Sequence, residues 1–415
     1  MGYFRLNQSC ILVEGKDEGS VYNLLNGRTY PLSHDETKIL KLLELGKEMK
    51  ETSEILQIPE HDVSSLITKL EKENVGVKLQ KSYVMDKIKI IPPLQKLKFF
   101  ESPPPASRLY IEINNKCDKG CWFCGYYGIK RSMGCIGCNI WKESDEKLGT
   151  EEIKNIAIEA KKLGFNQVCL TGGDLFQDIG VLRKACSIFL NNNFIVFVTI
   201  SSLHLNSSNF HTLKDMEHEN LNYVFQIPLI ENDKKEKLAE TIDIAKRYLK
   251  TKTLIFNVIY KLSDIVEDSH EFLNIKNMLG DSKVNSYIEI VDKDGFKNLT
   301  ERERKILVEG KIQPTDIFRY SHNVEYNPCL GGTLFIAHDG QVYPCGMLRN
   351  HPVGNIREQN LSEIVKGRLE KFWKLTKDNI APCQDCSLRY ACYECRAVEE
   401  SLTNDISSTA LCPRR

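Results

Sequence analysis

The sequence lacks the long apolar runs that would place it in a membrane. No such run approaches the roughly 20 residues that a spanning helix needs, and the first fifteen residues lack the apolar core of a signal peptide. Net charge is lacking as well, because 56 basic residues balance 56 acidic ones. This balance gives no reason to expect nucleic acid or a membrane surface as a partner. We therefore expect a cytoplasmic protein with neither.

Paired histidine ligands are also missing, since the nine histidines show no metal-binding spacing, and we expect them to have ordinary roles. Cysteine, in contrast, is abundant, with 15 in 415 residues. In a chain without an export signal, so many cysteines favour metal binding in a reducing cytoplasm over a disulfide framework. They are also clustered: three at 117–124, two at 135–138 and seven from 329 onwards.

The densest cluster holds Cys117, Cys121 and Cys124 within eight residues. Thiolates this close can hold three corners of one iron–sulfur cubane. No fourth cysteine follows at similar spacing, so one iron would stay open to a small molecule, as in a catalytic metal site. Half of a zinc site and chance clustering are the simpler alternatives.

This spacing, with Phe123 just before the third cysteine and a strand-like run before the motif, resembles the radical S-adenosylmethionine (radical SAM) superfamily. The resemblance implies that S-adenosylmethionine (SAM) binds the open iron of a [4Fe–4S] cluster and is cleaved to a 5′-deoxyadenosyl radical. It makes Cys117, Cys121 and Cys124 the cluster ligands and Phe123 a cofactor contact. We assign no catalytic residue beyond these ligands.

Two later turns resemble cofactor contacts of the same family. Gly172, Gly173 and Asp174 follow the second expected strand, where the family usually has Gly-Gly-Glu against the amino group of SAM. Asp174 stands in place of that glutamate. The resemblance therefore assigns a SAM contact more firmly to Gly172 and Gly173 than to the shorter Asp174 carboxylate. Ser201 or Ser202, after the third strand, occupies the place of a ribose contact; capping of the next turn is the alternative.

Four further residues have no assigned role. Cys135 and Cys138 form a two-residue pair that could add a cluster ligand, form a reducible pair, hold substrate as a thiol or have no function. Gln226 and Glu231, at the end of the fourth expected strand, are candidates for lining the pocket.

Six strand-like runs alternate with helical patterns between residues 106 and 310. The expected strands are 109–113, 168–170, 194–200, 223–230, 254–260 and 287–291. Their nearly continuous apolar character favours an α/β fold with a buried parallel sheet. The family resemblance implies a partial (βα)6 TIM-like barrel, in which the first cysteine cluster follows the first strand, where barrel enzymes place their chemistry.

The segment 1–100 reads as a β-hairpin, three helices and a strand over 75–84. A capping box at Ser33 and Glu36 starts the first helix. This order resembles the winged-helix PqqD-like recognition element of enzymes that modify ribosomally made peptides (RiPPs), which implies a leader peptide added as a strand. A DNA-binding winged helix and a plain capping domain are alternatives; the mixed charge of the third helix speaks against DNA. Prolines between 92 and 105 predict a stiff linker.

The segment 320–415 contains seven cysteines and a turn at Asp339-Gly340, and it resembles the SPASM domain with two auxiliary [4Fe–4S] clusters. The resemblance implies one cluster on Cys329, Cys345 and Cys395, and a second on Cys383, Cys386, Cys392 and Cys412. Two residues separate Cys392 from Cys395 where the family has three, which leaves the division of ligands open. Structural zinc is the alternative for this segment.

The three segments together resemble RiPP maturases. The resemblance implies an oxidoreductase whose substrate is a ribosomal precursor peptide and whose external electron donor is a protein such as flavodoxin or ferredoxin. A thioether cross-link from a cysteine sulfur to a carbon is the expected product. Carbon–carbon or carbon–oxygen cross-linking, a sulfatase-maturing or quinone-cofactor type of enzyme, and a zinc-binding winged-helix regulator are the alternatives.

Overall fold

The computed structural model describes residues 2–83, 86–87, 108–142, 146–230, 234–249, 254–282 and 284–414. The predicted proline-rich linker and Glu231 lie outside these residues. The chain divides into two compact units. The first joins residues 1–99 to 309–329 and 374–394, and the second joins 100–308 to 330–373 and 395–415. The three domains expected from the sequence, 1–100, 106–310 and 320–415, remain a prediction.

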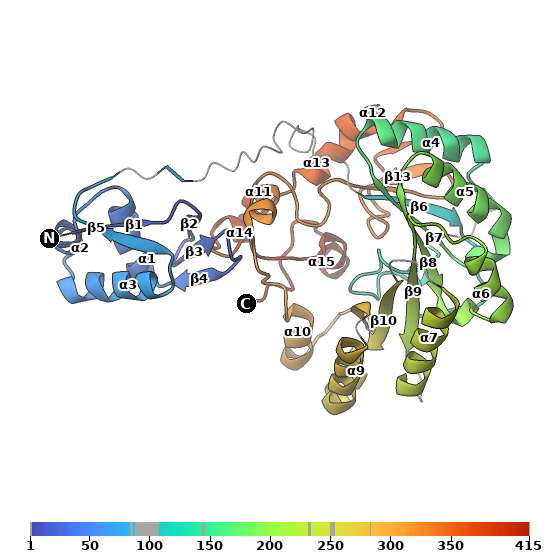
Figure 1. The fold of residues 1–415 in the computed structure, drawn as a ribbon, viewed down its shortest axis with the longest axis horizontal. Coiled ribbons are helices and arrows are strands. Elements are labelled where there is room, and N and C mark those ends of the chain that lie inside the picture. Colours follow the sequence, from blue (N-terminus) through green and yellow to red (C-terminus); the bar gives the residue numbers. More distant parts are fainter. Residues whose placement is uncertain are drawn as a thin grey trace. The chain divides into compact units, whose positions relative to one another are not determined.

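The first unit opens with short antiparallel sheets and three helices (Figure 1). Strands β2, β3 and β4 form one sheet in that order, and β1 pairs with β5. The bounds are β1 Tyr3–Leu6, β2 Cys10–Glu14, β3 Gly19–Asn23, β4 Thr29–Leu32, α1 His34–Glu44, α2 Met49–Leu56, α3 Glu60–Lys72 and β5 Gly76–Leu79. The sequence pattern did not indicate β1, which pairs with a strand some seventy residues away in the chain.

The predicted capping box starts α1. The Ser33 hydroxyl accepts a hydrogen bond from the Glu36 backbone at 3.2 Å, and the Glu36 carboxylate accepts one from the Ser33 backbone at 2.8 Å. Ile39, Leu40 and Leu43 of this helix are buried in the core of the unit. The amphipathic pattern therefore forms the helix that the sequence predicts.

Part of the cysteine-rich segment packs inside the first unit, on the β2–β3 hairpin. It contributes α11 Ile317–Glu325, the turn Lys377–Asn379 and α14 Ala381–Gln384. The rings of Tyr22 and Tyr320 lie 5.5 Å apart, and those of Tyr320 and Tyr390 lie 5.1 Å apart, both edge to face. The Tyr22 hydroxyl donates to the Ser387 carbonyl at 3.0 Å. Edge-to-face rings add to the burial energy, so this cluster fixes the segment onto the hairpin.

The second unit is built on one nine-stranded sheet with the order β11-β10-β9-β8-β7-β6-β12-β13-β14. The strands from β6 to β11 are all parallel, which confirms the α/β class and the alternation of strands and helices. Their bounds are β6 Arg108–Asn114, β7 Gln167–Gly172, β8 Ile195–Ser201, β9 Leu221–Leu229, β10 Leu254–Lys261 and β11 Asn285–Val291. Closure into a partial barrel remains a prediction.

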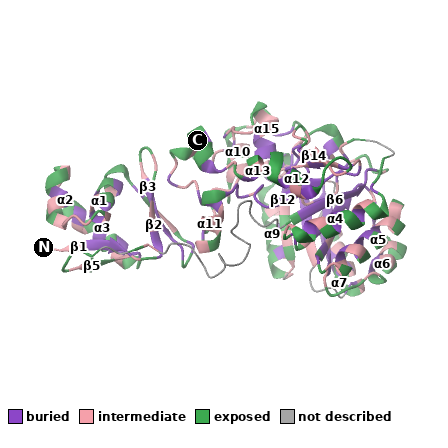
Figure 2. Ribbon diagram, turned by 90° about the horizontal axis from the view of Figure 1, so that it is seen from above, coloured by how far each residue is buried: buried purple, intermediate pink, exposed green. Residues whose placement is uncertain are grey.

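Helices follow the parallel strands along the outer side of the sheet (Figure 1). They are α4 Thr150–Lys162, α5 Ile179–Asn191, α6 Ser207–Lys214, α7 Lys234–Tyr248, α8 Leu262–Glu267 and α9 Ser269–Asp281. Helices α8 and α9 are separate because the Asp268 carboxylate accepts from the backbone of His270 and Glu271 and starts α9. Strand β6 is buried, whereas the helices expose their outer faces (Figure 2).

The hairpin of the C-terminal segment extends the same sheet. Strand β12 Thr333–Ile336 pairs in parallel with β6, and β13 Gln341–Tyr343 and β14 Gly354–Asn355 follow in antiparallel fashion. The predicted turn is present, and Gly340 adopts a φ of +84° that favours glycine. The remaining helices of this unit are α10 Glu301–Val308, α12 Leu361–Ile364, α13 Glu370–Trp373 and α15 Arg396–Thr403. No described helix has the length and apolarity to cross a membrane.

A buried ionic group holds this hairpin to the sheet. Glu112 of β6 is 1% exposed, and its carboxylate contacts His338 Nδ1 at 2.7 Å and the Arg349 guanidinium at 3.4 Å. Arg349 also lies over the ring of Phe335, 4.4 Å from its centroid. Burial by itself would raise the pKa of Glu112, but Arg349 and His338 outweigh the burial and hold this pKa below its usual value.

We expect Glu112→Gln to destabilise the protein by about 3 kcal/mol at neutral pH, because it leaves the largely buried Arg349 guanidinium without its anion. A lowered pKa in the folded state means that the ionised carboxylate stabilises fully above its unfolded pKa of about 4.3. That contribution is lost as the pH falls through the folded pKa, so the variant and the wild type should converge in acid. Urea unfolding at several pH values measures this. Glu236→Gln, at an exposed position of α7, is the control, and an equal effect of both changes would contradict the prediction.

Candidate active site

The first cysteine cluster lies in the loop that follows β6. A bulge separates Glu112 from Asn114 in the pairing of β6 with β7, just before this loop. Cys117, Cys121 and Cys124 line one hollow of about 650 Å³ that is partly open to solvent. The structure therefore brings together the three thiols that the sequence predicts as ligands of one metal cluster.

The three thiols are close enough to influence one another. Burial and the neighbouring Cys117 and Cys124 raise the pKa of Cys121 to about 11, and burial raises the pKa of Cys117. Without a metal, Cys117 and Cys121 therefore keep their protons at neutral pH. A metal cluster would bind the deprotonated forms and release protons on binding.

The two glycines after β7 let the chain approach the cysteine loop. A Cβ at Gly172 would lie 2.4 Å from the Asn114 carbonyl oxygen, and one at Gly173 would lie 2.2 Å from the Lys116 carbonyl oxygen. Gly172 has a φ of +145°, which residues with a side chain rarely adopt. The Gly173 backbone donates to the Asn114 side chain at 3.1 Å. The sequence suggested a close approach to a ligand, and the structure shows a close approach to the loop that carries the predicted ligands.

Asp174 lies at the start of the short helix Leu175–Asp178. One carboxylate oxygen accepts from the Phe176 backbone at 3.0 Å, and the other lies 3.3 Å from His204 Nδ1. The Asp174 backbone donates to the Lys116 carbonyl at 2.7 Å. Both oxygens of this carboxylate are therefore engaged within the protein.

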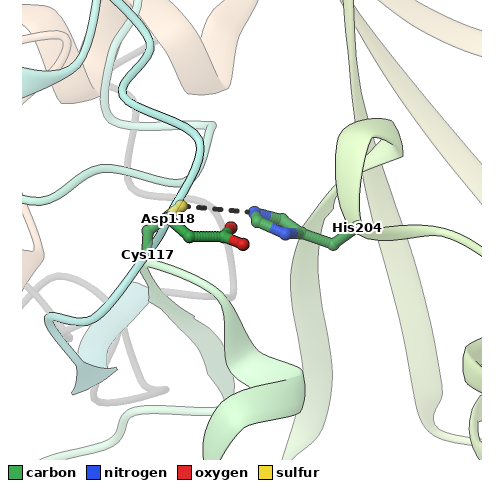
Figure 3. A group of neighbouring side chains, drawn as sticks. All are labelled: Cys117, Asp118 and His204. Carbon is green, nitrogen blue, oxygen red and sulfur yellow. Dashed lines mark hydrogen bonds between the residues drawn. The ribbon is translucent and has the colours of Figure 1, made fainter.

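His204 is a residue of the hollow that the sequence did not indicate. It lies in the short helix Ser202–His204 after β8 and is 8% exposed. Its Nε2 lies 3.5 Å from Cys117 Sγ (Figure 3). Cys117, Asp118 and His204 place one ligand atom each within 4.8 Å of one another. Burial lowers the pKa of His204, and the Asp174 carboxylate opposes that effect.

Of the three remaining residues predicted to contact SAM, two line the hollow and one does not. Phe123 lines it and is almost fully buried. Ser201 lines it too, and its hydroxyl accepts from the Leu203 backbone at 3.3 Å, which is the capping role named as an alternative. The Ser202 hydroxyl is buried with no hydrogen-bond partner among the described atoms. The hollow therefore includes Phe123 and Ser201, whereas Ser202 is not among its lining residues.

Cys138 is a fourth thiol of the same hollow, and Gln226 lines the hollow beside it, as expected for Gln226. The Gln226 side-chain amide donates to Cys138 Sγ at 3.2 Å. Burial raises the pKa of Cys138, Arg131 opposes this, and the three motif thiols raise it further. A fully buried ion pair supports the group: Arg131 contacts Glu289 at 2.6 Å and donates to the side-chain amide oxygen of Gln226 at 2.9 Å.

A comparison with protein families tests the resemblance that was predicted for the C-terminal segment. Residues 329–387 match the SPASM family, described as an iron–sulfur cluster-binding domain. This chain contains a SPASM domain. The predicted iron–sulfur cofactor is confirmed for that segment.

Three further matches are a curated protein and two solved structures. The AdoMet-dependent heme synthase of Nitratidesulfovibrio vulgaris is 36% identical over 95 residues, which span 21% of this chain and 25% of that protein. The crystal structure of Streptococcus suis SuiB bound to the precursor peptide SuiA has a TM-score of 0.51 and 14% identity, and covers 99% of this chain and 100% of SuiB. SuiB bound to S-adenosylmethionine superposes with a TM-score of 0.47, 13% identity and coverage of 99% of each chain. The chain shares its fold with SuiB, so the predicted resemblance is confirmed for the fold and for the SPASM segment.

The cysteines of the SPASM segment belong to both units of the chain. Cys329, Cys383, Cys386 and Cys392 lie in the first unit, and Cys345, Cys395 and Cys412 in the second. Within the first unit the Cys386 backbone donates to the Cys383 carbonyl at 2.9 Å. In the second, Cys345 is buried in an apolar cluster on which Cys395 packs. The two ligand sets implied by the sequence each draw on both units and remain a prediction.

We expect Gly173→Ala to remove about four iron atoms, one cubane, from the purified protein. The added Cβ must displace the Lys116 carbonyl and with it Cys117, whose own Cβ would lie at 3.2 Å. Iron and acid-labile sulfide analysis after anaerobic purification measures the loss. Gly180→Ala is the matched control, because no described atom lies within 4 Å of the Cβ it adds to α5. Full iron content in Gly173→Ala would show that the close approach is not required.

Proposed function

We propose that this chain is a radical SAM enzyme that modifies a ribosomally made precursor peptide. The observation that carries the proposal is the hollow in which Cys117, Cys121 and Cys124 meet, together with the SPASM segment. The AdoMet-dependent relative supports SAM as the cosubstrate. SuiB, which shares the fold and was crystallised with its precursor peptide, supports a peptide substrate.

The side chains of the hollow fit a cluster with one open iron. Thiols are the usual ligand type for such a cluster, and the turn at Gly172 and Gly173 packs directly against the loop that carries these three. With SAM bound, the cluster supplies a carbon radical that removes a hydrogen atom from an unactivated carbon. In the SPASM segment, Cys329, Cys345 and Cys395 would hold one auxiliary cluster, and Cys383, Cys386, Cys392 and Cys412 a second.

The protein's own contribution is binding, orientation and exclusion of water. Phe123 gives the hollow an apolar wall, and Ser201, which also lines it, would contact the ribose of SAM. Tyr126 and Tyr127, both about half exposed, line its mouth and offer aromatic surface to an entering peptide. A barrel of six βα units would carry all these groups at the carboxyl ends of its strands.

The leader peptide of the substrate would bind the N-terminal domain, residues 1–100. Strand β2 lies at one edge of the three-stranded sheet, so its outer backbone groups could pair with an added strand. The three helices and the β1–β5 pair support the winged-helix architecture of a recognition element. Binding there raises the effective concentration of the core peptide. An external protein such as flavodoxin or ferredoxin would supply electrons.

The product that we propose is a thioether. An S–H and a C–H bond of the peptide break, one C–S bond forms, and two hydrogens leave with their electrons. The SPASM clusters offer an acceptor for the second electron. Carbon–carbon and carbon–oxygen cross-links lose the same two hydrogens, and they differ from the thioether in leaving the cysteine thiol free.

Co-expression with a short cysteine-containing peptide encoded beside this chain tests the product. Intact mass should fall by two hydrogens, and one thiol should resist alkylation in the modified peptide. Tandem mass spectrometry would locate the link. A mass loss with every thiol still free to alkylation would exclude the thioether and favour a carbon–carbon or carbon–oxygen bond.

We expect the triple variant Cys117→Ala, Cys121→Ala, Cys124→Ala to lose about four iron atoms and all reductive cleavage of SAM, because it removes every thiolate of the first cluster. Iron analysis and chromatography of 5′-deoxyadenosine measure both. Cys169→Ser is the control, since that thiol lies on β7 and bonds to Thr199 outside the hollow. Cleavage of SAM by the triple variant would rule out the proposed function.

A further inference from the structure

The wall of the hollow next to Cys117 is formed by His204. Gly173, Ser201 and His204 line this side, whereas Asp174 is not among the lining residues. The carboxylate expected to meet the amino group of SAM therefore lies behind the imidazole ring. A ligand on an iron beside Cys117 would meet the ring first.

Asp174 is committed to two partners within the protein. One oxygen accepts from the Phe176 backbone at 3.0 Å, and the other lies 3.3 Å from His204 Nδ1. A carboxylate one methylene shorter than glutamate cannot keep these partners and also extend past the ring. Its position instead suits a residue that orients the imidazole.

The contacts of His204 define which ring nitrogen faces the hollow. The Asp174 carboxylate oxygen 3.3 Å from Nδ1 favours the tautomer with its proton on Nδ1. Nε2 is then the acceptor, and it lies 3.5 Å from Cys117 Sγ (Figure 3). The backbone on both sides is fixed, because Ser201 caps the short helix and the Asn209 side chain donates to the His204 carbonyl at 2.6 Å.

We propose that His204, oriented by Asp174, accepts the hydrogen bond from the ammonium group of SAM. His204 and Asp174 together then take the part that the resemblance assigns to a single glutamate. This inference rests on the proposed function, because it requires that SAM binds beside Cys117. His204 is a binding residue in this scheme, and Asp174 is a positioning residue.

The test measures binding of two ligands to the anaerobically reconstituted full chain by equilibrium dialysis. One ligand is SAM, and the other is its analogue lacking the amino group. His204→Ala should weaken binding of SAM about 10- to 100-fold, as expected for a hydrogen bond to a charged group. Binding of the des-amino analogue should stay within about threefold, since that ligand has no ammonium for the ring to contact.

A second variant separates this role from a structural one. Asp174→Glu adds the missing methylene, and removal of the ring opens the path into the hollow. The double variant Asp174→Glu, His204→Ala should therefore regain most of the affinity for SAM, a coupling that independent sites would not show. His211→Ala is the control on the neighbouring helix α6, where this exposed ring packs on Tyr248, and its affinity should match the wild type.

Three outcomes would overturn the inference: equal losses for both ligands, a double variant no better than His204→Ala, or loss of iron in His204→Ala. The electron paramagnetic resonance spectrum of the reduced His204→Ala protein should match the wild type when SAM is absent. A changed spectrum would indicate that the ring is an iron ligand, and this would also contradict the inference. If the wild type contains the clusters but binds no SAM, the proposed function itself fails.

Discussion

The close approach of two backbone segments controls the site. The turn after β7 passes so near the cysteine loop that a Cβ at Gly172 or Gly173 would lie inside the contact distance of a carbonyl oxygen. Hydrogen bonds from Gly173 and Asp174 to the loop maintain this approach. Because neighbouring parallel strands end at the same edge of the sheet, the contact holds Cys117 beside the wall contributed by β8.

Buried ion pairs are a second constraint on the loops of the site, although burying their charges costs desolvation free energy. Arg131 and Glu289 are both almost fully buried, and their contact is accompanied by hydrogen bonds that satisfy most of the guanidinium. Such a pair rarely adds stability over apolar residues, but breaking it is strongly unfavourable. It therefore favours one arrangement of the segment that carries Cys138. The pairing of Glu112 with Arg349 does the same for the hairpin beside β6.

The C-terminal segment is built into both units of the chain. Strand β12 extends the sheet of the parallel strands, and the residues around Tyr390 pack on the β2–β3 hairpin of the first unit. Within the second unit, backbone hydrogen bonds join strand β12 to β6, the strand that precedes the cysteine loop.

The amino-acid sequence alone determined the elements whose signals are local. Cysteine spacing, apolar strands, the capping box at Ser33 and the Asp339-Gly340 turn each depend on residues near in the chain, so each could be predicted. Tertiary structure decided what depends on distant segments: β1 pairing with β5, β12 joining β6, and His204 meeting both Cys117 and Asp174. A lone histidine has no periodicity or spacing to reveal it. This histidine and its two partners lie on loops after three different strands, and only the folded sheet brings those loops together.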